Sequence, residues 1–227
     1  MSSGSSLAAG NSKEDRSLGP GVGGDGLLVV LSGPSGVGKD TVLRRAMDME
    51  PGLRYSVSFT TRPPREGEVD GTSYSFVDES AFQAMAEGGE LLEWAQVHGH
   101  LYGTSLARVA GAVDRGEAIA LKIDVQGAAQ VRSRLAAGEL PRRFAGAGLF
   151  VFLLPPTTEE LQRRLLARDS DDVEAVDRRL GRATAELAEA GRYDHRIVND
   201  DVDRAARELL YLIAARRQGA SSGSPAR

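Results

Sequence analysis

The chain has 227 residues, of which 41% are hydrophobic and 26% are charged, a composition that is ordinary for a globular enzyme. Its net charge of -4 argues against a general nucleic-acid binder, and the absence of cysteine excludes disulfides, thiolate metal sites and cysteine nucleophiles. No apolar run approaches the ~20 residues of a membrane span. We therefore expect a cytoplasmic protein with neither a nucleic-acid partner nor a membrane partner.

Apolar periodicity along the chain predicts alternating strands and helices. The predicted strands are Leu27–Leu31, Tyr55–Phe59, Tyr74–Val77, Leu91–Val97, Ala118–Ile123, Leu149–Leu154 and His195–Val198. The predicted helices are Thr41–Met49, Glu79–Glu87, Ala107–Arg115, Gln126–Leu135, Glu159–Ala167 (capped by Thr158), Val173–Ala190 and Val202–Arg217. This alternation implies right-handed β-α-β units and a parallel sheet covered on both faces.

Both ends of the chain, residues 1–26 and 218–227, are dominated by Ser, Gly and charged residues. Such stretches bury too little apolar surface to offset the entropy lost on ordering, so we expect disordered tails around one folded region, 27–217. Within that region, residues 136–148 form a Gly/Ala/Arg-rich loop of unassigned role.

The segment after the first strand reads GPSGVGKDT and matches the phosphate-loop pattern G-x-x-x-x-G-K. Glycines let backbone N–H groups approach phosphate oxygens, and the lysine and the following helix N-terminus add positive charge. The predicted ATP-binding set is Gly33, Pro34, Ser35, Gly36, Val37, Gly38, Lys39, Asp40 and Thr41. The simpler interpretation is a Gly-rich turn between a strand and a helix.

One position departs from the phosphate-loop pattern. The residue after the lysine is usually Ser or Thr, whose hydroxyl ligates Mg²⁺, but here it is Asp40, followed by Thr41. A carboxylate is a good Mg²⁺ ligand, yet it also places negative charge beside a polyanion. We expect Mg²⁺ as the cofactor, bound with ATP near Asp40 and Thr41.

The segments SVSFTTRPPREGEVDG, YSF, ELLEWAQVHGHLYGTS and KIDVQGA follow the phosphate loop in that order, and together they resemble the guanylate kinase family. The resemblance implies transfer of phosphate from ATP to GMP. It also implies a three-layer α/β/α core with a parallel sheet, an inserted mixed β/α GMP-binding domain and a helical lid. The corresponding residues are 27–55, 107–155 and 190–217 for the core, 56–106 for the GMP-binding domain and 156–189 for the lid.

A nucleoside monophosphate presents a dianion, which forked guanidinium groups can bind bidentately. Arg62 and Arg65 lie three residues apart around a proline turn, and the resemblance adds the hydroxyls of Tyr74 and Tyr102. Considered alone, the segment TRPPR is more often a solvated basic turn.

Guanine offers two adjacent N–H donors, for which a carboxylate is the natural acceptor, and Glu93 occupies the family's guanine-reading position. Ser58 and Thr104 supply hydroxyl donors for O6, and Asp124 follows a strand at the edge where open α/β sheets bind ligands. The alternatives are a surface charge for Glu93 and a turn-forming aspartate for Asp124.

The resemblance assigns the lid arginines Arg164, Arg168 and Arg179 to catalysis, because cations around the moving group do most of the work in phosphoryl transfer. Neighbouring arginines compete for these roles, namely Arg163, Arg178 and Arg182. Asn199 matches a segment near the adenine in the family, but Asn-Asp is also a common turn. Lys122 is a second departure, because the family commonly has an acidic residue there.

Three functions remain open at this stage. The first is a guanylate kinase acting on ATP and GMP, with an oligomeric state that the residues do not indicate. The second is a non-catalytic guanylate-kinase-like module that binds proteins, which the intact Lys39 and loop glycines disfavour. The third is a kinase of another phosphorylated metabolite, such as a ribose bisphosphate, which Glu93, Tyr74 and Tyr102 disfavour.

Overall fold

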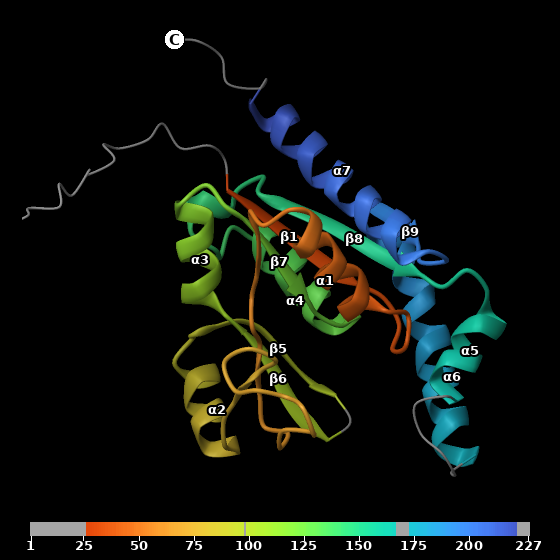
Figure 1. Ribbon diagram of the computed structural model, residues 1–227. Helices are drawn as coiled ribbons and strands as arrows, with labels where there is room; N and C mark the ends of the chain where they lie inside the picture. Colours follow the sequence, from red (N-terminus) through yellow and green to blue (C-terminus); the bar gives the residue numbers. More distant parts are fainter. Residues whose placement is uncertain (1–25, 98, 167–172, 222–227) are drawn as a thin grey trace, which may run out of the picture.

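The computed structural model describes residues 26–97, 99–166 and 173–221 (Figure 1). In chain order the elements are β1 (Leu27–Ser32), α1 (Lys39–Met49), β2 (Leu53–Tyr55), β3 (Phe59–Thr60), β4 (Ser75–Phe76), α2 (Glu79–Glu87), β5 (Leu91–Val97), β6 (His100–Ser105), α3 (Leu106–Asp114), β7 (Ala118–Lys122), α4 (Val125–Ala136), the 3₁₀ turn η1 (Arg142–Phe144), β8 (Gly148–Leu154), α5 (Thr158–Leu166), α6 (Val173–Ala188), the 3₁₀ turn η2 (Glu189–Arg192), β9 (His195–Val198) and α7 (Val202–Ser221).

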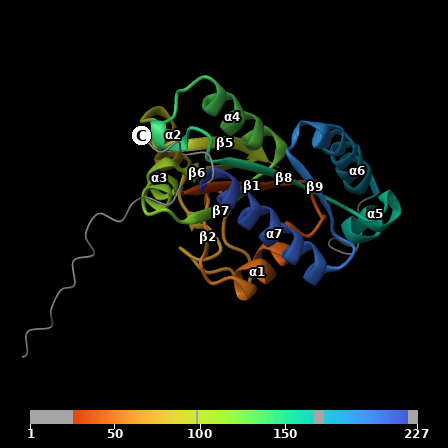
Figure 2. The ribbon, with the colours of Figure 1, turned by 90° about the horizontal axis from the view of Figure 1, so that it is seen from above.

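The larger sheet is parallel throughout, with strand order β2-β7-β1-β8-β9. All six residues of β1 are buried, which is why its sequence is a continuous apolar run. Leu27, Val29 and Leu31 pack in the cluster with α1 and α7, whereas Leu28 and Val30 pack with α3 and α4. Figure 2 shows α1 and α7 along one face of this sheet and α4 along the other. The predicted three-layer core is therefore confirmed.

The smaller sheet has the order β4-β3-β6-β5 and is mixed, because β3 pairs with β4 in parallel and with β6 antiparallel. Strand β6 was not predicted from the sequence. It pairs with β5 across a connection of two residues that ends in Gly99, whose φ is 82°. A glycine in a two-residue connection between alternating segments is a hairpin signal that could have revealed the strand.

The single strand predicted over Tyr55–Phe59 is wrong. Its first residue ends β2 in the large sheet, and its last residue begins β3 in the small sheet. Between them, the Ser56 N–H still bonds the Ala120 carbonyl, while the Ser58 carbonyl accepts from Ser75. Alternating burial continues across the gap because the chain passes from one sheet directly into the other, so periodicity alone could not detect the change.

Helix α4 of the core binds the edge strand of the small sheet through side chains. The Gln130 amide accepts from the Trp94 N–H over 3.2 Å and donates to the Trp94 carbonyl over 2.6 Å. Arg134 donates to the carbonyls of Leu91 and Leu92 over 3.0 and 2.7 Å. These bonds satisfy backbone groups that an edge strand leaves unpaired, and they join the small sheet to the core.

Helices α5 and α6 pack on each other through a small apolar cluster of their own, formed by Leu161, Leu165 and Ala183. In Figure 1 this pair and the small sheet form two separate lobes beside the core. Helix α5 begins one residue earlier than predicted, because Thr157 rather than Thr158 caps it and accepts from the Glu160 N–H.

The last helix is longer than the sequence suggested. Helix α7 continues to Ser221, four residues past the expected domain end at Arg217. Among the described residues, no helix is both long enough and apolar enough to cross a membrane.

We expect Gln130→Ala to lower the free energy of unfolding by about 1–2 kcal/mol, because two bonds to the Trp94 backbone are lost. Trp94 is the single tryptophan of the chain, so its fluorescence reports on the small sheet while far-UV circular dichroism reports on the whole molecule. The urea midpoint measured by fluorescence should fall more than the midpoint measured by circular dichroism. Gln162→Ala, at an exposed position on α5, is the matched control. Equal shifts of both midpoints would contradict a local docking role.

Candidate active site

The turn between β1 and α1 requires glycine at two points. Gly33 has a φ of 144°, and a Cβ there would lie 2.5 Å from the Leu153 carbonyl oxygen of β8. Gly38 has a φ of 98°, and a Cβ there would lie 2.5 Å from Nδ2 of Asn199, which follows β9. Because the loop packs directly on these neighbouring strands, a side chain at either position would displace it.

Lys39 is the first residue of α1, and its ammonium turns back over the loop. Nζ donates to the Gly33 carbonyl over 2.5 Å and to the Pro34 carbonyl over 3.2 Å. Burial lowers the pKa of Lys39, while the carboxylates of Glu186 and Asp40 oppose that shift. The loop therefore combines a fixed cation with the positive end of α1, an arrangement suited to a bound anion.

A carboxylate from α6 already lies against this loop. Oε2 of Glu186 accepts from the Ser35 backbone N–H over 3.1 Å. Burial raises the pKa of Glu186, and the nearby Lys39 opposes the shift. An internal carboxylate thus occupies a backbone donor that a phosphate oxygen could use.

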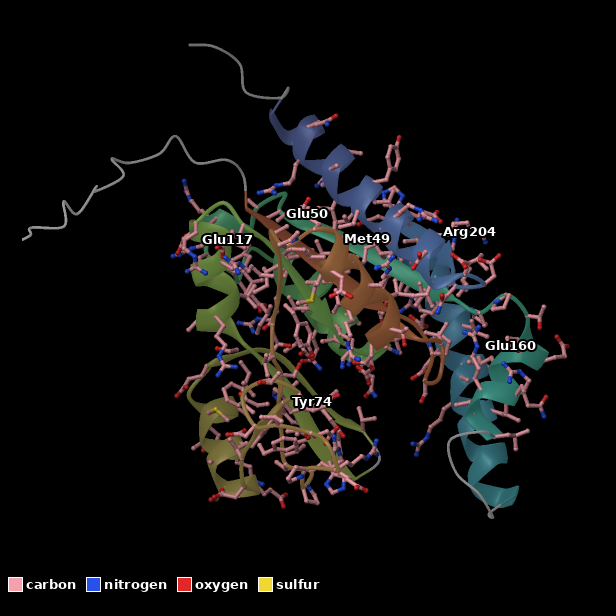
Figure 3. The ribbon with its side chains drawn as sticks, in the orientation of Figure 1. Met49, Glu50, Tyr74, Glu117, Glu160 and Arg204 are labelled. Carbon is pink, nitrogen blue, oxygen red and sulfur yellow. The ribbon has the colours of Figure 1, made fainter. Side chains whose placement is uncertain are left out.

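Asn199, predicted to bind ATP, and Arg164, predicted to be catalytic, both bond the backbone of the phosphate loop. Asn199 is buried and donates through Nδ2 to the Val37 carbonyl over 2.8 Å. Arg164 donates to the same carbonyl and to the Asn199 carbonyl, each over 3.3 Å, and its Nε donates to Glu160 over 2.7 Å. Figure 3 labels Glu160 on α5. Arg164 therefore links α5 to the phosphate loop and to the residue after β9, so its guanidinium is already engaged.

The predicted metal ligands lie on the first turn of α1. Asp40 and Thr41 are both exposed, and Asp40 forms an ion pair with Lys122. Among the described residues, no group of three or more acidic or histidine side chains could hold a metal ion. One carboxylate and one hydroxyl fit Mg²⁺ only when phosphate oxygens complete its coordination, which is the usual manner of binding in phosphoryl-transfer enzymes.

Arg62, on the opposite side of the site, is engaged by an acidic residue of its own loop. Its terminal nitrogens donate to Glu68 over 2.9 and 2.8 Å, and its Nε donates to the Tyr102 hydroxyl over 3.3 Å. This pairing lowers the pKa of Glu68. The side chain of Arg65 is exposed, and its guanidinium makes no hydrogen bond within the described residues. Of the two guanidinium groups predicted to bind phosphate, that of Arg62 is therefore already bound to Glu68, and that of Arg65 is open to solvent.

Tyr74 and Tyr102 lie beside this arginine. The Tyr74 ring centroid is 5.4 Å from the Arg62 guanidinium and 5.8 Å from the Tyr102 ring centroid. Figure 3 shows Tyr74 on the side of the small sheet that is nearest to the core. The predicted phosphate-binding group is thus brought together in space from β6, which carries Tyr102, and from the loop between β3 and β4, which carries Arg62 and Tyr74.

Glu93 is a buried carboxylate on β5, with 5% of its surface exposed. The Thr104 hydroxyl donates to its Oε1 over 2.5 Å, and a Cβ at Gly127 would lie 2.3 Å from its Oε2. Burial raises the pKa of Glu93 to about 7; the Thr104 bond opposes this shift and Asp124 adds to it. The alternative of a surface charge is therefore wrong for this residue.

Asp124 and Ser58 have more local roles. Asp124 caps α4 by accepting from the Gly127 N–H over 2.9 Å, and it also accepts from Gln126 over 3.2 Å. Asp124 is therefore the N-capping residue of α4, independently of any ligand that it binds. Ser58 is buried in the segment between the two sheets.

Two of the predicted lid arginines are not placed. Arg168 lies outside the described residues, and the side chain of Arg179 on α6 also lies outside the described part. Arg163, a competitor for these roles, is paired with Glu160 over 2.7 Å on the exposed side of α5.

The profile of the guanylate kinase family matches residues 26–216. The chain belongs to the guanylate kinase family. It is 44% identical to the guanylate kinase of Syntrophotalea carbinolica and 46% identical to that of Geobacter sulfurreducens, each over 191 residues. These alignments cover 84% of this chain and 86% and 89% of the relatives, respectively.

A solved guanylate kinase has the same architecture. The crystal structure of guanylate kinase from Anaplasma phagocytophilum is 30% identical, with a TM-score of 0.69, and the match covers 86% of this chain and 87% of that one. The resemblance noted in the sequence is therefore confirmed.

Three residues that form contacts at or beside the site of this guanylate kinase were not predicted from the sequence. Glu68 lies six residues after Arg62 in a turn, a spacing at which an ion pair could have been considered. Gln130 and Glu186 lie on helices far in sequence from the backbone groups that they bind, and no motif marks them.

We expect the stability of Glu93→Gln, relative to wild type, to increase with pH. The pKa of Glu93 is about 7 in the folded state against an ordinary 4.5, so the carboxyl stabilises the fold below pH 4.5 and loses this contribution as pH rises through 7. The gain of the amide variant between pH 5 and pH 8 should be about 2–3 kcal/mol, measured by urea unfolding without ligand. For the exposed Glu90→Gln, the difference from wild type should not change over this range. A pH-independent difference for Glu93→Gln would contradict the buried-carboxyl account.

Removal of the Glu186 charge should strengthen anion binding at the loop. Glu186→Gln keeps an acceptor for the Ser35 N–H but removes the negative charge near Lys39, so the affinity for inorganic tripolyphosphate should rise roughly tenfold. Calorimetry in low salt without metal is the measurement. Glu159→Gln, an exposed carboxylate on α5, is the control for net charge. Equal tripolyphosphate affinities for wild type and Glu186→Gln would show that Glu186 does not compete with phosphate.

Proposed function

We propose that this chain transfers the γ-phosphoryl group of ATP to GMP, giving ADP and GDP, in purine nucleotide metabolism. The observation that carries the proposal is the convergence of two half-sites. One is the phosphate loop with Lys39, and the other is a buried carboxylate, Glu93, next to the arginine and tyrosine group around Arg62. A triphosphate suits the first half-site, and a guanine monophosphate suits the second.

The transfer needs no covalent intermediate on the protein. A phosphate oxygen of GMP attacks the γ-phosphorus, the bond from that phosphorus to the β,γ-bridging oxygen breaks, and ADP leaves with the bond electrons. The task of the protein is to align these oxygens and to stabilise their charge. In this proposal Lys39 and the loop N–H groups hold the donor, and Arg65 with Tyr74 and Tyr102 holds the acceptor.

Arg62 needs an exchange of partners before it can bind phosphate with both terminal nitrogens. Glu68 accepts from both of them, and a dianionic phosphate is a stronger competitor than water for the same fork. Until that exchange, Arg62 positions the Tyr102 hydroxyl, to which its Nε donates.

Base selection would depend on Glu93. Its carboxylate is confined between Thr104 and the bare backbone of Gly127, so it accepts donors in one direction only. Guanine supplies two adjacent N–H donors, and adenine lacks that pair. A ligand that excludes water from Glu93 without pairing it would be rejected, because an unpaired buried carboxylate is costly.

Mg²⁺ is part of this proposal. The Asp40 carboxylate and the Thr41 hydroxyl would hold it together with the phosphates of ATP, and the ion would neutralise charge that develops on the β- and γ-phosphates.

The two alternative functions receive less support. A protein-binding module has no need for Gly33 and Gly38, whose backbone angles are unfavourable for other residues, or for Lys39 folded over the loop. A kinase of a sugar phosphate has no need for a buried carboxylate like Glu93.

The test is phosphate transfer to GMP, AMP, CMP and UMP, measured by coupled release of ADP for wild type and Glu93→Gln. We expect GMP to be strongly preferred. The variant should lose about 2–4 kcal/mol in kcat/KM for GMP, roughly 10²-fold or more, because one acceptor oxygen becomes an amide donor. AMP should change much less. Wild type without preference for GMP, or a GMP/AMP ratio changed by less than about threefold in the variant, would contradict base reading by Glu93.

A further inference from the structure

Lys122, at the carboxyl edge of the large sheet, has no role in the transfer proposed above. Lys122 ends β7 and donates to Oδ1 of Asp40 on α1. The Lys122 side chain is 11% exposed, whereas that of Asp40 is 63% exposed. A nearly buried ammonium is thus paired with a carboxylate that is largely exposed to water.

The surroundings of Lys122 come from both sheets. Its Nζ lies 5.7 Å from the Tyr55 ring centroid, at the end of β2, and 5.2 Å from the Tyr74 ring centroid, in the small sheet. The same Tyr74 ring contacts Arg62, and Asp40 directly follows Lys39. Lys122 therefore stands between the phosphate loop and the phosphate-binding group of the small sheet.

The contacts of Lys122 leave it able to bind a further anion. An ammonium has three N–H donors, and Oδ1 of Asp40 accepts one of them. Aromatic ring faces attract a cation but are weaker acceptors than phosphate oxygens. When phosphates arrive, their charge attracts Lys122, and the exposed Asp40 can release it without leaving a buried charge unpaired, whether Asp40 then faces water or the Mg²⁺ that accompanies ATP.

We propose that Lys122 binds phosphate oxygens of both nucleotides and positions donor and acceptor for transfer, with Asp40 as its partner until they bind. This inference rests on the proposed function, because it needs a donor and an acceptor at the same edge of the sheet. Lys122 differs from Lys39, whose ammonium bonds carbonyls of the donor loop itself.

The test is binding of an adenosine–guanosine pentaphosphate, a ligand that spans both half-sites, by calorimetry in EDTA. Lys122→Met should lower affinity for this ligand roughly tenfold or more, but affinity for ADP or GMP alone by less than about threefold. Its kcat for GMP should fall by a similar factor of about ten or more, with smaller changes in both KM values.

The double variant Asp40→Asn with Lys122→Met separates positioning from mere structural pairing. It removes both charges, so its thermal stability should approach that of wild type even if Lys122→Met alone folds poorly. Asp40→Asn alone is the reference, because it removes the same negative charge near the phosphates. If Lys122 binds phosphate, the double variant binds the pentaphosphate roughly tenfold more weakly than Asp40→Asn does. Affinities of these two variants that agree within about threefold would overturn the inference, because a purely structural pair is already broken in Asp40→Asn.

Arg44→Met is the control for charge, since it removes a cation from an exposed position of α1 and should leave pentaphosphate affinity unchanged. A wild-type chain that does not phosphorylate GMP would overturn the proposed function together with this inference. A wild-type chain that is active, with Lys122→Met binding the pentaphosphate as wild type does, would overturn the inference alone.

Discussion

The site depends on the parallel pairing of β1 with both β7 and β8. In a parallel sheet all carboxyl ends meet at one edge, so the loop after β1, the residues that end β7 and the turn after β9 become neighbours. Register sets the details, because Leu31 pairs with Lys122 and Gly33 packs on the Leu153 carbonyl. A slip of one residue in β1 would exchange the side chains that pack with α1 and α7 for those that pack with α3 and α4, so the fit of these two clusters favours the observed register.

Acidic side chains of the chain itself occupy two cations and one backbone N–H group that a phosphate could bind. Glu68 binds Arg62, Glu186 binds the Ser35 N–H near Lys39, and Asp40 binds Lys122. Each pairing neutralises a group that would otherwise attract a phosphate, so phosphates must compete with these carboxylates. We expect this competition to lower phosphate affinity, while each of these three groups keeps a partner until a ligand binds.

Glu93 illustrates a different conflict between stability and function. Burial raises its pKa to about 7, which means that the ionised form is unfavourable in the folded chain. The strand position, the Thr104 hydroxyl and the absence of a side chain at Gly127 nevertheless keep the carboxyl where it is. A buried carboxylate with too few hydrogen-bond donors is typical of a binding site, because a ligand can supply the missing donors and so stabilise the ionised form.

Much of this protein could be predicted from sequence because the signals are local. The apolar run Leu27–Leu31 indicated a buried parallel strand, and the glycine spacing from Gly33 to Lys39 indicated the turn that follows it. The helix over Glu79–Glu87 and the strand over Leu91–Val97 have the predicted ends. These features follow from side-chain periodicity and backbone angles, which act over a few residues.

Long-range contacts were decided by the tertiary structure alone. The break between β2 and β3 has no local signature, since burial alternates across it while the chain changes sheets. Arg62 and Arg65 look alike in the segment TRPPR. Only the fold of the loop decides that Glu68 pairs with the guanidinium of Arg62 but with the backbone N–H of Arg65. Glu186 and Ser35 are 151 residues apart, and Lys122 and Asp40 are 82 apart. A sequence shows that such charges exist, but their pairing depends on which helices and strands the packed core brings together.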